Sequence, residues 1–296
     1  MWFILALTAL LFWSGSDLFS KIGSKPDDKY SHHKMVMAVG LVMGIHAIIE
    51  ICTGTKVTLN DIITYLPASL LYISSMILGY VGLRYIELSV SSPICNSSGA
   101  IASLLCFFFL NQRVEKLSAV AIAVICIGVV ALGITEYTES DEARLMRSTN
   151  IKYTKSILAI MLPVLYCVLD AFGTFADAVI LETLNEDTAN VAYELTFLLS
   201  GIISAIYVLV IKKEKLTFKR ETPKLVGAVC ETAGQFAYVY AISANAVSAA
   251  PVISAYCAAS VLWSRIFLKE KLSFKHYIAI AVTVVGIVML GISEGA

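Results

Sequence analysis

Six acidic residues interrupt stretches of the chain that are otherwise apolar: Asp17, Glu50, Asp170, Asp177, Glu194 and Glu231. An ionised side chain at the centre of a bilayer costs about 2.5–3.5 kcal/mol, so such residues usually face a protein interior, a partner or a transport path. The basic residues that we place near these stretches are Arg84 and Arg265, close enough to helix ends to reach water. The sequence therefore predicts an acid-rich interior that favours a cation, the amino group of a zwitterion or protons.

Two of these acids stand in the same local pattern. Asp17 follows Trp13 by four residues, and Asp170 follows Tyr166 by the same step. A four-residue step places acid and aromatic ring on one face of a helix, one turn apart. Together they could bind an ammonium group, by charge pairing and by a cation–π attraction of about 0.5–2 kcal/mol. The alternative is a structural role, in which each acid caps a helix or bonds a neighbouring one.

A third polar group lies in the second half of the chain. Glu231 and Gln235 share a helix face, and Tyr238 lies about one turn further on. The matching positions in the first half are Ile73 and Ile77, so this patch is not part of a shared architecture. We therefore expect Glu231 to contact substrate or to carry a coupling proton. The alternative is a glutamate that bonds a neighbouring Ser or Tyr.

The remaining acids suggest other roles. Glu194 lies near the expected start of a helix, where it could contact substrate or lie at the membrane interface. Glu50 follows His46 by one turn, and this pair could relay protons because histidine titrates near neutral pH. A structural contact is the alternative for the pair. We expect Asp177 at the aqueous end of its helix.

One expected helix carries two aromatic residues on one face. Tyr256 and Trp263 are seven residues apart. Both could line a cavity, although an interfacial aromatic belt explains Trp263 equally well. We include Tyr256 among the expected substrate contacts.

Composition indicates a membrane protein. Of the 296 residues, 58% are hydrophobic and 15% are charged, the net charge is zero, and the mean hydropathy is +0.80. Soluble domains are about 45–50% apolar and about 25% charged. Zero net charge gives no case for nucleic-acid binding, and no catalytic, metal-binding, cofactor-binding or ATP-binding pattern stands out. The seven cysteines lie in or beside apolar stretches and are expected to pack there as small residues.

The chain is internally duplicated. Residues 93–136 align without a gap with residues 251–294, so that Gly128 matches Gly286 and Gly133 matches Gly291. The apolar stretches are long enough to cross a bilayer as helices. We predict an all-α membrane protein with ten transmembrane helices, at about 2–22, 34–53, 62–82, 88–110, 118–136, 154–176, 189–211, 223–243, 247–268 and 275–293.

Five helices in each copy would insert the second copy upside down relative to the first. We predict two inverted repeats around a central cavity, residues 1–137 and 154–296, joined by a charged loop at 138–153. Alternate loops lie on the same side of the membrane. The loops on the same side as residues 138–153 hold 19 of the 22 Lys and Arg residues. The loops on the opposite side hold the remaining three, Lys56, Arg113 and Lys116. The positive-inside rule places the basic loops in the cytoplasm and both termini outside.

The end of each repeat resembles the EamA-type transporters of the drug/metabolite transporter superfamily. Residues 268–273 read Leu-Lys-Glu-Lys-Leu-Ser, and the helix after them carries Gly286 and Gly291. The first copy has Leu110, Gln112 and Val114 in the corresponding loop, so that Gln replaces the usual Glu. The resemblance implies ten helices in two inverted five-helix repeats and a cavity open to one side at a time. It leaves amino acids, amines, choline-like cations, sugars and nucleotide conjugates open as substrates.

Together these patterns predict a secondary transporter of a small amino-bearing metabolite, such as an amino acid, an amine or a choline-like compound, that works by alternating access in a cell membrane. The expected partners are the substrate, the lipid bilayer and a coupling proton or ion. A carrier of a neutral or anionic metabolite on the same fold is one alternative, and a membrane sensor or scaffold is another. The expected substrate contacts are Trp13, Asp17, Tyr166, Asp170, Glu194, Glu231, Gln235, Tyr238 and Tyr256.

Overall fold

The computed structural model describes residues 1–25, 27–110, 114–138 and 157–293, and every regular element in them is a helix. Nine helical segments of this part are long and apolar enough to cross a membrane. The helices are α1 (Trp2–Gly23), α2 (Ser31–Thr53), α3 (Leu59–Gly82), α4 (Leu88–Asn96), α5 (Ser98–Phe109), α6 (Lys116–Thr138), α8 (Ile157–Ile180), α9 (Glu186–Ala205), η1 (Ile206–Ile211), α10 (Phe218–Ser254), α11 (Tyr256–Trp263), η2 (Ser264–Leu268) and α12 (Phe274–Ser293).

The longest apolar segment, Phe218–Leu268, covers two helices that the sequence predicts separately. The backbone leaves the helical conformation inside α10 at Asn245, where φ is −163° and ψ is 82°. The amide oxygen of Asn245 accepts a hydrogen bond from the backbone N–H of Ser248 at 3.1 Å. Asn245 therefore acts as an N-cap for the part of α10 that follows it.

Two other helices are interrupted near their middle. The first interruption separates α4 from α5 at Ser97, and the second separates α10 from α11 at Ala255. Pro93 and Pro251 each lie four residues before an interruption. Polar side chains beside these interruptions line one cavity: Asn96 precedes the first, and Ser254 and Tyr256 flank the second.

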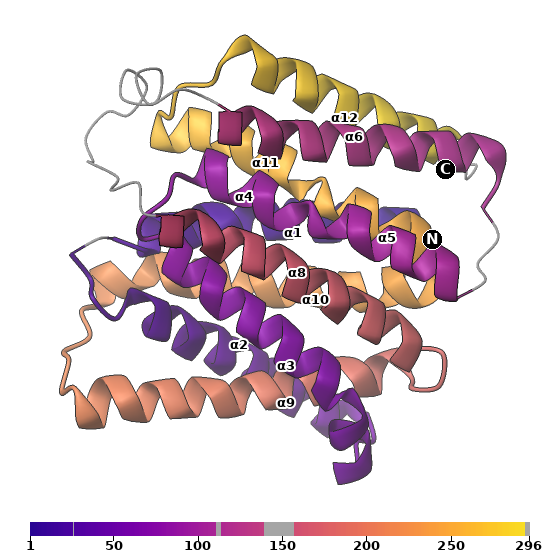
Figure 1. Cartoon of the computed structure of the whole chain (residues 1–296). Coiled ribbons are helices and arrows are strands. Elements are labelled where there is room, and N and C mark those ends of the chain that lie inside the picture. The colour runs from indigo at the N-terminus through magenta and orange to yellow at the C-terminus, as the bar shows by residue number, and fades with distance from the viewer. Residues whose placement is uncertain (26, 111–113, 139–156, 294–296) are drawn as a thin grey trace.

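The helices pack in pairs that are distant in sequence. α1 lies along α10, α3 along α8, α2 along α9 and α6 along α12. Figure 1 shows α6 and α12 side by side at one edge of the bundle, with α2 and α9 at the opposite edge. The core between these pairs contains small residues that admit close contact, as is common where membrane helices meet.

The α6–α12 pair is set by two matching glycines. A Cβ added at Gly128 would lie 2.2 Å from Thr283 Oγ1 and 2.8 Å from its backbone nitrogen. A Cβ added at Gly286 would lie 2.7 Å from Ile125 Cγ1 and 2.8 Å from its backbone nitrogen. The two helices therefore touch backbone to side chain at both positions, and no larger residue fits without a shift.

Basic residues lie deeper in the helices than the sequence reading placed them. Lys34 of α2 and Lys224 of α10 are buried, as is Arg84, whereas Arg265 is exposed. The Nζ atoms of Lys34 and Lys224 lie 3.0 and 3.4 Å from carboxylate oxygens of Asp28. Lys224 also lies 2.8 Å from Glu221. The expectation that Arg84 and Arg265 are the basic residues near the apolar stretches was wrong. Helices α2 and α10 extend past those stretches, and their lysines are neutralised in ion pairs.

The Asp28 ion pairs give a prediction for stability. Burial alone would raise the pKa of the Asp28 carboxyl, but the hydrogen bond from Lys34 and the charges of Lys224 and Arg220 lower this pKa below its ordinary value. A lowered pKa stabilises the fold above the ordinary value, and this contribution is lost as the pH falls through the lowered one. We expect Asp28→Asn to reduce the melting temperature at about pH 7 and to have little effect at about pH 2.

Asp27 supplies the matched control for this experiment. It is the neighbouring residue, its one ion pair with a described residue is to Arg220 at 2.8 Å, and its side chain is 72% exposed. Surface ion pairs contribute about 0–1 kcal/mol, so Asp27→Asn should have a smaller effect at every pH. Equal effects of the two substitutions on thermal unfolding would refute the role given to Asp28.

Candidate functional site

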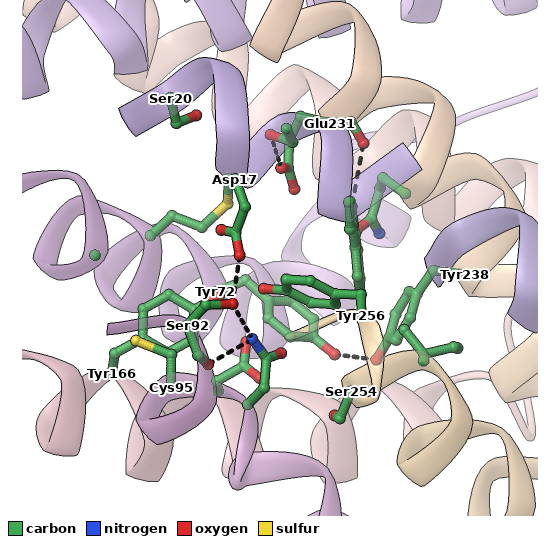
Figure 2. A pocket seen from close by; sticks show the side chains of 18 of the residues that line it. Asp17, Ser20, Tyr72, Ser92, Cys95, Tyr166, Glu231, Tyr238, Ser254 and Tyr256 are labelled. Carbon is green, nitrogen blue, oxygen red and sulfur yellow. Dashed lines mark hydrogen bonds between the residues drawn. The ribbon is translucent and has the colours of Figure 1, made fainter. Parts of the chain in front are cut away.

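One cavity lies among helices from both halves of the chain. Its empty volume, including the part that is open to solvent, is about 910 Å³. Its walls come from α1, α3, α4, α8, α9, α10 and α11. Eight of the nine expected substrate contacts line it: Trp13, Asp17, Tyr166, Asp170, Glu231, Gln235, Tyr238 and Tyr256. Figure 2 shows five of these side chains, which come from different helices: Asp17, Tyr166, Glu231, Tyr238 and Tyr256.

Asp17 joins three helices at the cavity wall. Its Oδ2 accepts hydrogen bonds from Ser92 Oγ of α4 at 2.5 Å and from Ser260 Oγ of α11 at 2.8 Å. Asp17 thus holds α1 against one helix from each half of the chain. It lies six residues before the end of α1 at Gly23, so the carboxyl is inside the bundle and away from the helix terminus.

Asp170 and Glu231 repeat this arrangement with one serine each. Ser98 Oγ donates to Asp170 Oδ2 at 2.7 Å, and Ser16 Oγ donates to Glu231 Oε2 at 2.7 Å. In the described part of the chain, no hydrogen bond reaches the second oxygen of Asp17, Asp170 or Glu231. Three carboxyl groups around one cavity therefore each keep an oxygen that can accept a hydrogen bond from a bound molecule.

Among the described residues that line the cavity, none is basic. Lys21 lies one turn beyond Asp17, but its Nζ donates to the carbonyl oxygens of Leu83 at 2.7 Å and Ile86 at 2.6 Å. The ammonium group of Lys21 thus lies against the residues that follow α3 and not on the cavity wall. The cavity's own charged groups are acidic, which attracts positive charge.

Aromatic rings form much of the remaining wall. The centroid of the Trp13 ring lies 5.0 Å from that of Tyr238 and 5.8 Å from that of Tyr256. The indole Nε1 of Trp13 donates to the backbone oxygen of Glu231 at 3.3 Å. The hydroxyl groups of Tyr72 and Tyr238 are hydrogen-bonded to each other. Ring faces beside carboxylates are a favourable environment for an ammonium group.

Several lining residues were not identified from the sequence. They are mostly polar or aromatic and include Tyr72, Tyr80, Asn96, Thr174 and Tyr193. Tyr80 had a usable signal, because it is the repeat counterpart of Tyr238. No sequence signal identifies the serines that bond the acids, because serine is common in membrane helices. Only the folded structure shows that Ser16, Ser92, Ser98 and Ser260 meet a carboxylate.

Glu194 does not line the cavity. Its side chain is fully buried, and Oε1 and Oε2 lie 2.8 and 3.0 Å from Nδ1 of His46. Glu50 lies on the outer side of the same histidine, with Oε1 3.8 Å from Nε2. The structure therefore separates Glu194, His46 and Glu50 from Glu231, because α9 turns Tyr193 to the cavity and Glu194 to α2. Glu194 is not retained as a substrate contact.

Asp177 is not at an aqueous end. It is fully buried, and its Oδ1 accepts a hydrogen bond from the Tyr65 hydroxyl at 2.6 Å. α8 continues to Ile180, four residues beyond the expected end, so another helical turn covers this acid. Trp263 also turns inward, and its Nε1 donates to Ser14 Oγ at 3.1 Å.

A comparison with solved structures supports the fold. A crystal structure of another protein superposes with a TM-score of 0.65 at 15% sequence identity, over 98% of this chain and 96% of that chain. At this identity the match shows the fold alone. None of the curated proteins compared with the chain matches it.

The family comparison covers nearly the whole sequence. The model of the EamA-like transporter family matches residues 1–134 and 156–292. This match confirms the resemblance seen in the loop and glycine pattern at the end of each half. Members of this family are transporters and not enzymes, and the apolar helices agree with a protein that crosses the membrane several times. The chain belongs to the EamA-like transporter family.

Proposed function

We propose that this protein is a secondary active transporter of a small amino-bearing metabolite, cationic or zwitterionic. The observation that carries the proposal is the cavity wall, where Asp17, Asp170 and Glu231 each keep one carboxyl oxygen without a hydrogen bond in the described part of the chain. A primary ammonium group would donate hydrogen bonds to these oxygens, and a quaternary ammonium group would be held by their charge, while carbon substituents pack against Trp13 and Tyr238. A carrier of a sugar or an anionic conjugate has less support, since a basic group among the described lining residues is lacking.

The proposed architecture is ten transmembrane helices in two inverted five-helix repeats, residues 1–137 and 154–296, around the cavity. Reciprocal contacts support it: Gly128 meets Thr283, and their repeat counterparts Gly286 and Ile125 also meet. The interruptions at Ser97 and Ala255 are also repeat counterparts. Pairs of interrupted helices at equivalent places in two repeats are a common way to build a transport site.

The position of the cavity among helices of both proposed repeats supports alternating access. Asp17 of the first repeat bonds Ser260 of the second, and Asp170 of the second bonds Ser98 of the first. Rocking of one repeat against the other would change these contacts and the side on which the cavity opens. A substrate that bridges the carboxyl groups would shift the balance between the two states only by the difference between its contacts in each.

Counterflow in proteoliposomes tests the proposed function. Liposomes that contain the purified protein are loaded with unlabelled methylammonium, choline or glycine, and uptake of the same labelled compound is followed. We expect one or more of these amino-bearing probes to exchange, and glucose and uridine monophosphate to fail. Exchange of only glucose or the nucleotide would assign the fold to the alternative substrate class. Binding without exchange of any probe would indicate a sensor.

The proposed orientation has both termini outside the cell membrane. In a Cys52→Ser background, a cysteine at Lys56 would lie in an outer connection and a cysteine at Lys215 in a cytoplasmic one. We expect a membrane-impermeant maleimide to label Lys56→Cys on intact cells and to label Lys215→Cys only after lysis. The reverse pattern would place the termini in the cytoplasm.

A further inference from the structure

A second polar cluster lies between α2 and α9, away from the cavity lining. It consists of Glu50 and His46 of α2 and of Glu194 and Asn190 of α9, and we name it the α2–α9 cluster. Burial increases along it: the side chains of Glu50 and His46 are 25% and 30% exposed, whereas Asn190 is 1% and Glu194 is 0% exposed. We propose that this cluster binds the coupling proton of the transporter. The proposal rests on the proposed transport function.

The contacts within the cluster suit the uptake of one proton. Thr55 Oγ1 donates to Glu50 Oε2 at 3.2 Å, next to the connection that follows α2. Glu50 faces Nε2 of His46, and Nδ1 of His46 faces both oxygens of Glu194. The imidazole thus connects a partly exposed carboxylate with a fully buried one. A proton that arrives from water at Glu50 can move to Nε2 without crossing apolar surroundings.

The charge of the buried pair changes with this proton. The hydrogen bond between His46 Nδ1 and Glu194 needs one shared proton, and with that proton alone the pair has a net negative charge. A second proton on Nε2 creates an imidazolium, and the pair becomes neutral overall. A neutral pair is far less costly than a net charge in an apolar environment, so only the protonated pair favours movement of α2 relative to α9.

Asn190 gives independent support for a bound species here. In residues 1–25, 27–110, 114–138 and 157–293, neither its amide nitrogen nor its amide oxygen has a hydrogen-bond partner. A buried polar group without a partner costs about 1–3 kcal/mol and usually indicates a bound water or ion. Asn190 lies four residues before Glu194 and three before Tyr193, which lines the cavity. A water on Asn190 would therefore lie within about one helical turn of both Glu194 and Tyr193.

The charged groups named around the cluster are acidic, so they do not neutralise the charge of Glu50 and Glu194. Titratable groups nearby on α9 are Glu186 and Asp187, whose carboxylates accept hydrogen bonds from Ser243 and Tyr240 of α10. On α10, the ring of Phe236 lies 5.6 Å from the ring of His46. The neighbouring charges among the described residues are thus acidic, which favours the arrival of protons at the single imidazole.

Backbone contact between the two helices explains how the proton would act. A Cβ added at Gly40 of α2 would lie 2.8 Å from the Cα of Gly201 of α9. Gly40 precedes His46 by six residues and Gly201 follows Glu194 by seven, so the helices run in opposite directions from this crossing. At about 1.5 Å per residue the cluster is about 10 Å from the crossing. Rotation about the crossing would open or close the His46–Glu194 contact.

Two measurements test this proposal. The first is the infrared difference spectrum of the purified protein between about pH 5 and about pH 8, where an imidazole gains or loses its proton. We expect a histidine signal that His46→Gln removes and Glu194→Gln alters. His33→Gln is the matched control, because His33 lies on the same helix but contacts Tyr207 and not the cluster. A spectrum unchanged by His46→Gln and Glu194→Gln would overturn the proposal.

The second measurement compares two modes of transport in proteoliposomes, with methylammonium, choline and glycine as probes. We expect His46→Gln and Glu194→Gln to keep counterflow but to reduce accumulation driven by a pH gradient by about 5- to 150-fold, the usual size of coupling between two sites. Retained accumulation would assign the proton to Glu231 in the cavity and refute the cluster. Equal loss of both modes would refute a coupling role. If the wild type exchanges none of these probes, the proposed function fails, and the infrared spectrum alone decides the proton site.

Discussion

Asp17→Asn and Asp170→Asn are each expected to weaken binding and transport of the amino-bearing probe that the wild type carries. Hydrogen bonds to charged groups contribute about 1.5–3 kcal/mol, which corresponds to about 10- to 150-fold in affinity. Asparagine keeps the size of the side chain and can still accept the bond from Ser92 or Ser98, so the loss would come from the charge. Thermal-shift titration and counterflow measure the two effects.

Asp177→Asn is the matched control for Asp170→Asn. Both acids lie on α8 and are covered by the protein, but Asp177 accepts a bond from Tyr65 and does not line the cavity. We expect Asp177→Asn to leave the affinity for the probe unchanged, whatever its effect on melting temperature. Equal losses of affinity for the two variants would mean that burial of an acid in α8, and not its place in the cavity, controls transport.

Gly128→Ala is expected to produce the largest loss of stability. The added methyl group would overlap Thr283 backbone atoms 2.8 and 3.0 Å away, which cannot rotate out of the way. Overpacking of this kind costs about 1–3 kcal/mol. Gly286→Ala should have a similar effect, since its Cβ would lie 2.8 Å from the backbone nitrogen of Ile125. Thermal unfolding of the purified protein in detergent gives the comparison.

Gly133→Ala provides the control for the α6 substitution. It lies on the same helix, and the nearest atom to its added Cβ is 3.6 Å away, an ordinary van der Waals contact. We expect no loss of melting temperature, and a small gain is possible because alanine favours the helix by up to about 1 kcal/mol over glycine. A loss as large as that of Gly128→Ala would contradict the close contact between α6 and α12.

The helical, duplicated character of the chain could be predicted from the sequence because apolar length and internal alignment do not depend on packing. Residues of the cavity wall were predictable where spacing fixes a shared face, as for Trp13 with Asp17 and Tyr166 with Asp170. The direction of the Glu194 side chain could not be predicted, because Tyr193 and Glu194 are adjacent in the sequence. Only the close approach of Gly40 to Gly201 shows which of the two faces α2. Asp177 was misplaced because a helix end set from hydropathy alone omitted the last turn of α8.

Serine partners of the acids show a further limit of sequence reading. Ser92 and Ser260 both donate to Asp17, although they are far from it in the sequence and lie on different helices. Nothing distinguishes them from serines that bond their own helix, such as Ser264, which donates to the Val261 carbonyl. The specific contact follows from how the interrupted helices α4 and α11 approach α1.

Binding of charged compounds and their neutral isosteres tests the acid-lined cavity most directly. Choline is compared with 3,3-dimethyl-1-butanol, in which carbon replaces the charged nitrogen, and glycine with glycolate, in which a hydroxyl replaces the ammonium group. Isothermal titration of the purified wild type should show binding of choline, glycine or both, and no binding of the corresponding isostere. Equal binding within both pairs, or binding of glycolate alone, would contradict recognition of positive charge by Asp17, Asp170 and Glu231.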